Sequence, residues 1–364
     1  VRQAMKYIGI NSIGSTLFVV ACGLLYAGTG TLNMADLAVR TAGLTGARAD
    51  LVTAASMLLL VVFGLKAATF PVIYWLPDAY PVVPPGVIGY FAGLLTKVGV
   101  YSLLRMFVMV FRQEGQAFAL DVLLLLSGFT MVLGVMGAMC QWELRRLLSW
   151  HIVSQVGYMV MGIGLAGSPD ARVVRLAIAG TILHVVHNII VKSCLFLVGG
   201  IGERITGSQE LRRMGGILTL APGVAGLFLV AGFSLAGMPP FSGFLSKLVL
   251  MQAGLAGGSY VVVAAAVGTS FLTLYSMMKI WSYAFWRKRS QERPLAAYRP
   301  LMLPTAVLVA LTILIGVWAE PFLALAGRAA AGLADPREYI QAVLGPAAAV
   351  RVPALPGHRA EGAG

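Results

Sequence analysis

The chain has 364 residues, of which 59% are hydrophobic and 11% are charged. Soluble domains carry about 25% charged residues, so this composition excludes a water-soluble fold and indicates a membrane protein. The net charge of +13 does not indicate nucleic-acid binding, because most of the arginines lie in short loops between apolar runs, as the loop arginines of membrane proteins do.

Apolar runs long enough to cross about 30 Å of hydrocarbon recur along the chain. They predict an all-α, polytopic membrane protein with about nine spans. These are residues 4–27, 51–76, 87–111, 120–140, 147–166, 173–201, 217–254, 260–286 and 301–327. Residues 336–344 predict a short amphipathic helix, and the stretch after it, rich in Pro, Gly and Ala, is expected to be disordered.

Two predicted spans contain helix-breaking residues. Pro71 lies near Lys66, and Pro239 and Pro240 lie within a Gly-Pro-rich stretch just before Lys247. Proline removes a backbone donor and interrupts a helix. Broken helices at membrane depth are tolerated where they line a hydrated cavity, so both positions indicate an ion pathway.

Loop charges predict the orientation of the chain in the membrane. Twelve lysines and arginines lie in loops on the side where the chain starts, and five lie in the short loops of the other side. The sequence therefore predicts a protein of the cell (inner) membrane, with a cytoplasmic chain start and, after nine spans, a C-terminal tail outside.

Four lysines lie well inside apolar stretches, namely Lys66, Lys97, Lys192 and Lys247. A lysine there costs a few kcal/mol or more unless it finds a polar partner or loses its proton. We interpret these lysines as proton carriers. The alternatives are static interhelical hydrogen bonds or snorkelling to the interface, and snorkelling is favoured for Lys279 near a span end.

All fourteen acidic residues fall in loops, at helix ends or in the tail. The buried lysines therefore have no carboxylate partner at mid-span within this chain. We expect the counter-ion to come from a segment outside the chain or from another subunit, and we expect the chain to be a piece of a longer protein.

Two polar stripes accompany the lysines. His184, His187 and Asn188 precede Lys192 in the sixth span, and helical spacing places His184, Asn188 and Lys192 on one face. Histidine passes protons near neutral pH, which favours a relay over a static core histidine. The fifth span carries a second stripe, interpreted as a water wire or as ordinary interhelical hydrogen bonding: His151, Ser154, Gln155 and Tyr158.

The residues do not indicate a metal site, a cofactor or a membrane-embedded enzyme. Cys22, Cys140 and Cys194 form no CxxC pair and are interpreted as buried apolar residues. No nucleophile–base pair or metal-ligand set can be recognised in the sequence.

Several of these segments resemble the proton-pumping membrane subunits shared by respiratory complex I and the Mrp-type antiporters. They are residues 63–71 with 75–79, residues 95–101 and residues 237–244. Residues 30–36, 274–280 with 285–286, and 336–344 are most similar to the D-type subunit of the multisubunit sodium/proton antiporter. The resemblance extends to about Gly345.

This resemblance implies a fourteen-helix fold with two inverted five-helix repeats, of which this chain would hold helices six to fourteen. The implied divisions are 1–118 for the rest of the first repeat, 119–286 for the second repeat, 287–327 for the final helix with its basic loop, and 328–364 for the tail. The family also has a glutamate on the fifth helix, which pairs with the lysine at position 66.

The resemblance further implies roles for the residues. Lys66 would serve the first half-channel and Lys247 the second. Lys97, His184, His187 and Lys192 would form the central axis. The implied function is exchange of cytoplasmic sodium, or another monovalent cation, for external protons within a hetero-oligomeric membrane complex, without a cofactor. The alternative is a proton-pumping subunit of an NADH:quinone oxidoreductase or a membrane-bound hydrogenase.

Overall fold

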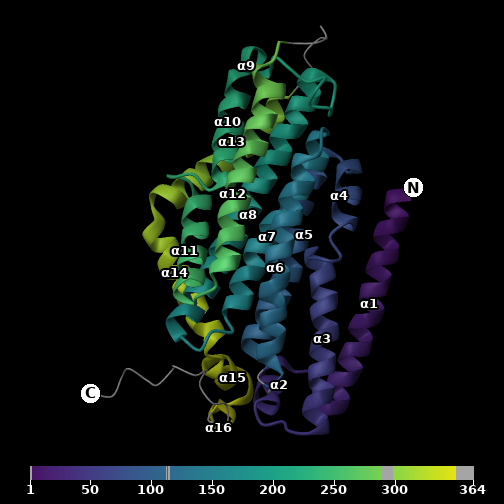
Figure 1. The fold of residues 1–364 in the computed structure, drawn as a ribbon, viewed down its shortest axis with the longest axis vertical. Helices are drawn as coiled ribbons and strands as arrows, with labels where there is room; N and C mark the ends of the chain where they lie inside the picture. The colour runs from purple at the N-terminus through teal and green to yellow at the C-terminus, as the bar shows by residue number, and fades with distance from the viewer. Residues whose placement is uncertain (1, 112, 114, 289–297, 350–364) are drawn as a thin grey trace.

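The computed structural model describes residues 2–111, 113, 115–288 and 298–349. These residues form helices joined by short loops, and Figure 1 shows most of the long helices aligned with the long axis of the molecule. Within the described ranges, seven helices are long and apolar enough to cross a membrane. The prediction of an all-α membrane protein is confirmed.

The first part of the chain supplies three long helices and the short elements between them. In chain order these are α1 (Arg2–Thr29), α2 (Met34–Thr41), α3 (Ala47–Ala67), α4 (Trp75–Ala79), η1 (Tyr80–Val82), α5 (Pro85–Leu104) and the π-helix η2 (Arg105–Val110).

The remainder supplies the centre and the other edge of the bundle. In chain order the elements are α6 (Gln116–Met139), α7 (Leu144–Leu165), α8 (Ala171–Thr206), α9 (Ile217–Leu220), α10 (Pro222–Ala236), α11 (Ser242–Ala256), α12 (Tyr260–Ile280), the π-helix η3 (Trp281–Trp286), α13 (Arg299–Val317), α14 (Ala319–Ala334), α15 (Arg337–Leu344) and α16 (Pro346–Ala349).

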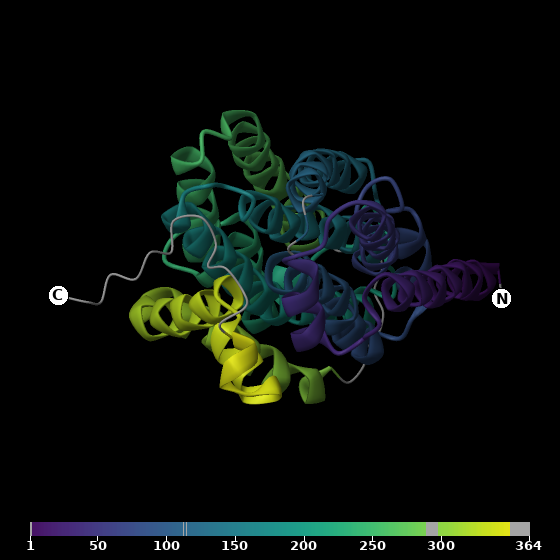
Figure 2. The same ribbon diagram turned by 90° about the horizontal axis from the view of Figure 1, so that it is seen from below.

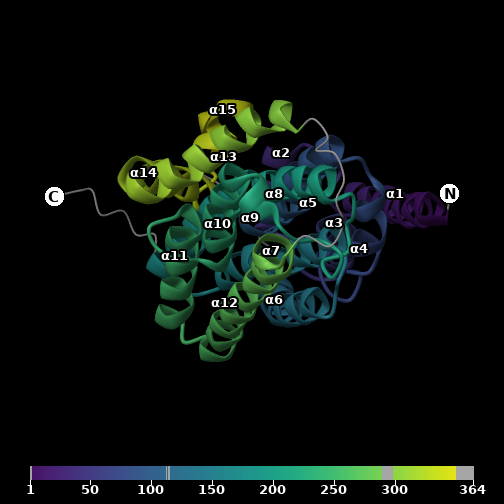
Figure 3. The ribbon, with the colours of Figure 1, turned by 90° about the horizontal axis from the view of Figure 1, so that it is seen from above.

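Helix α8 lies at the centre of the bundle. Figures 2 and 3, which look along the bundle, place α1 at one edge and α14 at the opposite edge. In the most apolar 18-residue stretch of α8, 61% of the residues are buried, compared with 17% in that of α1. Its 36 residues extend about 54 Å at roughly 1.5 Å per residue, which exceeds the hydrocarbon thickness. The polar residues of its middle turns therefore lie deep within protein.

The second predicted span is shorter than expected and is followed by a non-helical segment. The prediction that it continues to residue 76 is wrong, because α3 ends at Ala67. Ala68 takes a left-handed conformation with φ 61°, and its N–H returns to the carbonyls of Gly64 and Leu65. Pro71 follows, where a helix could not continue. The chain becomes helical again at Trp75, so this path is a broken helix.

The second predicted break occurs where the sequence places it. Helix α10 ends at Ala236, Gly237 adopts φ 92°, and α11 begins at Ser242. Only glycine adopts such a positive φ without strain, which explains a glycine at the end of α10. Pro239 and Pro240 lie in the short connection and hold it out of a helix.

The ninth predicted span, residues 301–327, is divided into α13 and α14 at Trp318. The prediction of one continuous helix is wrong there. A proline ring clashes with the carbonyl four residues earlier, so Pro321 prevents α13 from continuing past Val317. The same ring is well tolerated in the first turn of α14. Both helices pack along α8.

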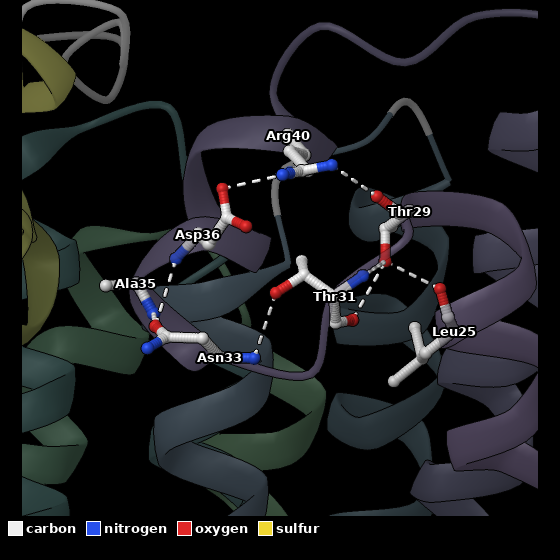
Figure 4. A network of polar contacts seen from close by, with 7 residues as sticks. All are labelled: Leu25, Thr29, Thr31, Asn33, Ala35, Asp36 and Arg40. Carbon is white, nitrogen blue, oxygen red and sulfur yellow. Dashed lines mark hydrogen bonds and ion pairs between the residues drawn. The ribbon is translucent and has the colours of Figure 1, made fainter. Parts of the chain in front are cut away.

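Polar contacts at the turn between α1 and α2 fasten these two helices (Figure 4). Asn33 caps α2 by accepting a hydrogen bond from the N–H of Ala35 at 2.9 Å. Arg40 donates to Asp36 at 2.9 Å and to the carbonyl of Thr29 at 2.8 Å. The carbonyl of Thr29, the last residue of α1, therefore finds a partner outside the helix.

The C-terminal residues pack on this same end of the molecule. The predicted amphipathic helix is confirmed as α15, which buries Ile340 against Ala35 and Ala38 of α2. Figure 1 shows α2 and α15 at one end of the bundle and α9 at the other. Residues 350–364, which include most of the stretch predicted to be disordered, lie outside the described residues. Of the three cysteines, only Cys194 is buried within this chain.

Helices α6 and α7 approach each other closely because glycines line their contact. A Cβ atom added to Gly134 would lie 2.5 Å from the backbone nitrogen of Ser154. Small residues permit such close packing between membrane helices. The approach fixes the depth and rotation of α7, which carries one of the two polar stripes.

We expect Gly134→Ala to destabilise the protein by about 1–3 kcal/mol, because the added methyl group meets rigid backbone of α7. Gly128→Ala on the same helix is the matched control, since nothing lies within 4 Å of its Cβ position. Both changes add the same group to α6. Unfolding of the detergent-solubilised protein by sodium dodecyl sulfate measures the difference, and equal midpoints for the two variants would contradict the contact.

Candidate proton path

Two histidines of α8 are joined to the broken helix through serine hydroxyls. His187 Nδ1 lies 2.8 Å from Ser242 Oγ, and His184 Nδ1 lies 3.0 Å from Ser246 Oγ. Both serines belong to the first turns of α11, directly after the break. The imidazole rings of His184 and His187 are 5.5 Å apart. The break therefore places hydroxyl groups against the histidines that the sequence predicted as a relay.

The hydroxyl cluster continues from His187 into α13. Ser242 Oγ lies 2.5 Å from Thr312 Oγ1, and Thr312 Oγ1 lies 2.8 Å from Ser234 Oγ on α10. Thr312 thus joins both sides of the break, and all three hydroxyls are buried. Sequence analysis missed this threonine, although a hydroxyl buried at membrane depth costs free energy unless it finds a hydrogen-bond partner.

Lys247 is held by the carbonyl end of α10. Its ammonium nitrogen lies 2.9 Å from the carbonyl oxygen of Leu235 and 3.1 Å from that of Ala236. These carbonyls lack a helical partner because α10 ends there. Lys247 also donates to Ser270 at 3.2 Å and lies 4.7 Å from the ring centre of Tyr158. It borders a cavity of about 240 Å³ formed with α12.

Lys66 has a different environment beside the first break. Its ammonium nitrogen lies 2.5 Å from Asn11 Oδ1 on α1. The carbonyl of Leu65, near the end of α3, accepts instead from the indole of Trp75 at 2.9 Å. Lys66 borders a cavity of about 380 Å³ between α1, α3 and α5. The lysine at this break therefore faces a cavity and an amide side chain.

Lys97 and Lys192 are buried, with 4% and 0% exposure, as Lys247 is with 3%. Lys97 donates to the carbonyl of Ala92 at 2.6 Å, and Lys192 donates to that of Leu148 at 3.4 Å. One carbonyl offsets only part of the cost of burying an ammonium group. Neither position is a snorkelling anchor.

The ion pairs formed among the described residues lie away from these four lysines. Asp78 pairs with Lys6 at 2.8 Å and with Arg146 at 3.1 Å, and Arg145 pairs with Glu203. These residues lie at helix ends or beside them. The four mid-span lysines instead donate to neutral oxygen atoms, as the placement of the acidic residues in the sequence predicts.

The polar stripe of α7 is buried and meets α12. His151 Nε2 lies 2.8 Å from Ser276 Oγ, and Tyr158 Oη lies 2.8 Å from Ser270 Oγ. Ser154 and Gln155 hydrogen-bond to each other at 3.3 Å. The two serines of α12 were missed by sequence analysis. For Ser276 the signal was its spacing with Thr269 and Thr273 along one helical face.

Several buried polar atoms along these helices have no hydrogen-bond partner among the described residues. They include Thr96 Oγ1, His151 Nδ1, Gln155 Oε1, His184 Nε2, His187 Nε2, Thr269 Oγ1 and both side-chain atoms of Asn188. Buried polar groups are almost always paired with protein or ordered water. Their concentration beside the lysines and histidines indicates a path that water can enter.

The structure brings some of the predicted residues together and leaves others apart. Lys247 and Tyr158 share the hydroxyl of Ser270, and the ring of Tyr158 lies 5.3 Å from that of His184, which in turn lies 5.5 Å from that of His187. Lys66 lies apart from this cluster, with Asn11. Among the described residues, no group of three or more His, Cys, Asp and Glu side chains is arranged to hold a metal ion.

Residues 1–273 match the family described as NADH:quinone oxidoreductase/Mrp antiporter, TM. The match covers more than half of the chain. The chain belongs to this family.

Relatives of the family include two proteins named as the D-type subunit of a Na(+)/H(+) antiporter. The chain is 43% identical to that of Alkalihalophilus pseudofirmus and 35% identical to that of Bacillus subtilis, each over 94% of this chain and 68% of the relative. The fold superposes on a chain of the Mrp complex from Dietzia sp. with a TM-score of 0.83 and 32% identity, covering 95% of this chain and 70% of that chain.

The same fold occurs in respiratory enzymes of the family. A chain of the archaeal membrane-bound sulfane sulfur reductase gives a TM-score of 0.83 at 26% identity, over 94% of this chain and 68% of that chain. A chain of Thermus thermophilus complex I gives 0.77 at 23% identity, over 91% of this chain and 69% of that chain, which is a likeness of fold alone.

We expect Ser242→Ala in this family member to lower the free energy of unfolding by about 1–3 kcal/mol, because it leaves His187 Nδ1 buried without a partner. Ser282→Ala is the control, since that exposed hydroxyl donates to the carbonyl of Met278, one turn earlier. The same denaturant titration compares them. If Ser242→Ala unfolds at the midpoint of Ser282→Ala, the serine does not support the histidine.

Proposed function

We propose that this chain is a D-type subunit of a multisubunit sodium/proton antiporter, which exchanges cytoplasmic cations for external protons. Two relatives that carry this name, at 43% and 35% identity, support the assignment. The fold match to an Mrp complex supports assembly with other membrane subunits. The proposed proton carriers are Lys66, Lys97, His184, His187, Lys192 and Lys247.

The observation that carries this proposal is the pairing of four membrane-embedded lysines with neutral oxygen atoms. A carboxylate would hold the lysine proton by strong Coulomb attraction. A carbonyl or amide oxygen can accept a hydrogen bond from either the ammonium group or the neutral amine, which keeps two N–H groups. Each lysine can therefore give up a proton without leaving its place.

Protons moving along such a row influence one another. Positive charges separated by a few ångströms repel strongly where the dielectric constant is low. Arrival of a proton at one lysine or histidine therefore favours release from its neighbour. Each of the lysines beside the two breaks borders a cavity that water could fill, so a transferred proton has a next acceptor.

We further propose that the two halves of the chain correspond to repeats, with residues 1–118 in the first, 119–286 in the second and 287–327 following them. Two similarities support this division. Each half has a helix break, between α3 and α4 in the first and between α10 and α11 in the second. Each half also ends with a long helix that continues into a six-residue π-helix, η2 or η3. Residues 328–364 form the C-terminal part.

The proposed orientation places the chain start in the cytoplasm and the C-terminal tail outside. The excess of loop lysines and arginines on the side of the chain start supports it. The loops assigned to that side also meet one another, since Arg287 donates to the carbonyl of Arg212 at 3.0 Å and Leu144 pairs with Gln209. Three of the arginines counted for the orientation lie outside the described residues, namely Arg112, Arg289 and Arg293.

We expect Lys66→Ala and Lys247→Ala, each in the complete complex, to reduce sodium-dependent proton exchange by about a hundredfold or more, as loss of a proton carrier does. Lys288→Ala, in an exposed position beyond a helix end, should leave exchange unchanged. Fluorescence of a pH-sensitive dye in everted membrane vesicles measures the exchange. Retained antiport in both lysine variants would refute the proposed path.

The orientation has a separate test. Alkaline phosphatase folds to an active form only outside the cytoplasm, so its fusion after Gly345 should be active. A fusion after Arg287, in the loop assigned to the cytoplasm, should be inactive and is the matched control. The reverse pattern of activity would show that the chain has the opposite orientation.

The same family contains subunits of quinone-linked enzymes, which is the alternative function. The higher identity to proteins named as D-type antiporter subunits favours antiport. The two functions differ in their energy source. Deleting an antiporter subunit should make cells sensitive to sodium and alkali, whereas deleting a respiratory subunit should abolish NADH-dependent proton pumping.

A further inference from the structure

Two cationic side chains share one indole ring between the end of α6 and the start of α7. Lys279 Nζ, from the last turn of α12, lies 3.9 Å from the ring centre of Trp142, and the guanidinium of Arg212 lies 4.0 Å from the same centre. The two charges are therefore at most about 8 Å apart, close to the Debye length at physiological ionic strength, so they repel each other. None of the proposed proton carriers takes part in this contact.

A third cation, Arg287, joins this pair. Its Nη1 atom donates to the carbonyl of Arg212 at 3.0 Å. The ion pairs formed among the described residues include none of these three cations. We call this group of side chains the Trp142 cluster, which consists of Trp142, Arg212, Lys279 and Arg287.

The described carboxylates that lie next to the cluster in sequence leave it positively charged. Glu210 is already paired with Arg213 at 2.8 Å. Glu143 follows Trp142 and can offset only one of the charges of the cluster. An excess of positive charge at a membrane surface attracts anionic headgroups.

Two cations of the cluster have hydrogen-bond donors to spare. Lys279 Nζ donates to the carbonyls of Met139 and Gln141 at 2.9 and 2.8 Å. An ammonium group offers one N–H group more than these two carbonyls can take. The guanidinium of Arg212 stacks on the indole and forms no hydrogen bond to another described residue. Both side chains can therefore donate to an anion.

Aromatic residues place the cluster at the level of the lipid headgroups. Trp142 meets Tyr283 edge to face, with ring centres 5.1 Å apart. The π-helix η3 also carries Trp281 and Trp286, and Trp286 is 68% exposed. Tryptophan and tyrosine are enriched where the hydrocarbon of a membrane meets its polar surface. The cluster therefore lies at one membrane interface, on the face assigned to the cytoplasm.

Exposed apolar faces lead from the cluster into the hydrocarbon. Helices α6 and α12 pack beside each other. Each exposes large apolar side chains at helical spacing on one face. From Phe271 to Lys279 the helix rises about 12 Å at roughly 1.5 Å per residue, which is comparable with the depth of one hydrocarbon leaflet. The exposed residues are Leu125, Phe129 and Met136 on α6, and Phe271, Tyr275 and Met278 on α12.

We propose that the Trp142 cluster binds the phosphate headgroup of an anionic phospholipid, whose acyl chains lie along the exposed faces of α6 and α12. The phosphate oxygens accept the spare N–H groups of Lys279 and Arg212, and the negative charge offsets the repulsion between these two cations. The apolar faces favour a lipid over a free anion. This inference goes beyond the proposed transport function, and lipid binding is measured without an ion gradient.

Lipid retention tests the site. The complete complex is stripped of lipid in detergent, incubated with equal amounts of dioleoylphosphatidylglycerol and dioleoylphosphatidylcholine, and analysed by native mass spectrometry. We expect retention of phosphatidylglycerol in preference to phosphatidylcholine. Arg212→Gln combined with Lys279→Gln should weaken retention at one site per chain by about tenfold or more, because two basic groups near the headgroup are lost. Equal retention of the two lipids by the unaltered complex would overturn the proposal.

Matched variants show whether the position of the charges matters. Lys288→Gln combined with Arg299→Gln also removes one lysine and one arginine, from exposed positions outside the cluster on the same face. This control should retain phosphatidylglycerol as the unaltered complex does. Lys279→Arg keeps a cation beside Trp142 and should retain it too. If the control loses as much lipid as the pair of changes in the cluster, general surface charge explains the binding and the site is wrong.

Competition separates a lipid from a free anion. Excess inorganic phosphate carries the same charged oxygens but no acyl chains. It should leave the bound phosphatidylglycerol in place, because the apolar faces of α6 and α12 hold the chains. Complete displacement by inorganic phosphate would contradict the proposed contact with these faces.

Photocrosslinking in cells identifies what covers the cluster. Ser282 is exposed, and it follows Lys279 by three residues. Ser282→p-benzoylphenylalanine should give an anionic phospholipid adduct on irradiation, detected by mass spectrometry of the chain. Val261→p-benzoylphenylalanine, at an 84% exposed position in the first turn of α12, should show no preference for anionic lipid. An adduct of residue 282 with another protein subunit in place of lipid would refute the proposed occupant.

Discussion

The hydrogen-bonding demand of backbone groups inside hydrocarbon governs this structure. A helix that stops within the membrane leaves carbonyl oxygens without partners, and the bilayer offers no water to replace them. At the end of α10 the partner is the Lys247 ammonium group. The same contact satisfies the helix end and retains a cation at mid-membrane. The structural need and the proposed transport role therefore meet in one side chain.

The two helix breaks meet this demand in different ways. At α10 the free carbonyls take a lysine, whereas at α3 the Leu65 carbonyl takes the indole of Trp75, and Lys66 turns to Asn11. Lys66 borders the larger of the two cavities, and among the described residues Asn11 is its hydrogen-bond partner. The lysines of the two proposed half-channels therefore have different hydrogen-bond partners. Such a difference suits carriers that must differ in proton affinity for protons to move in one direction.

Helix α8 connects these environments because it is buried along most of its length. Its histidines reach the hydroxyls of α11, and its lysine reaches a carbonyl of α7. A change in the protonation of any one group alters the field at the others, since little water separates them. Close packing of α6 on α7 through glycine fixes the outer wall of this polar interior, so the distances between its groups are set by backbone contacts.

Sequence alone determined the membrane class, the approximate spans and both helix breaks, and it supplied the candidate proton carriers, because apolar run length, proline and buried charge are local signals. It overextended the second span, because the left-handed turn at Ala68 depends on backbone angles. It also missed the division at Trp318, although Pro321 is a local signal for it. It also missed Asn11, Ser242, Ser270, Ser276 and Thr312. Ordinary hydroxyl and amide residues in apolar helices acquire a role only through what faces them. Tertiary structure decided that Ser276 faces His151 and Ser242 faces His187, because the relative rotation and depth of packed helices are set by contacts between residues far apart in the chain.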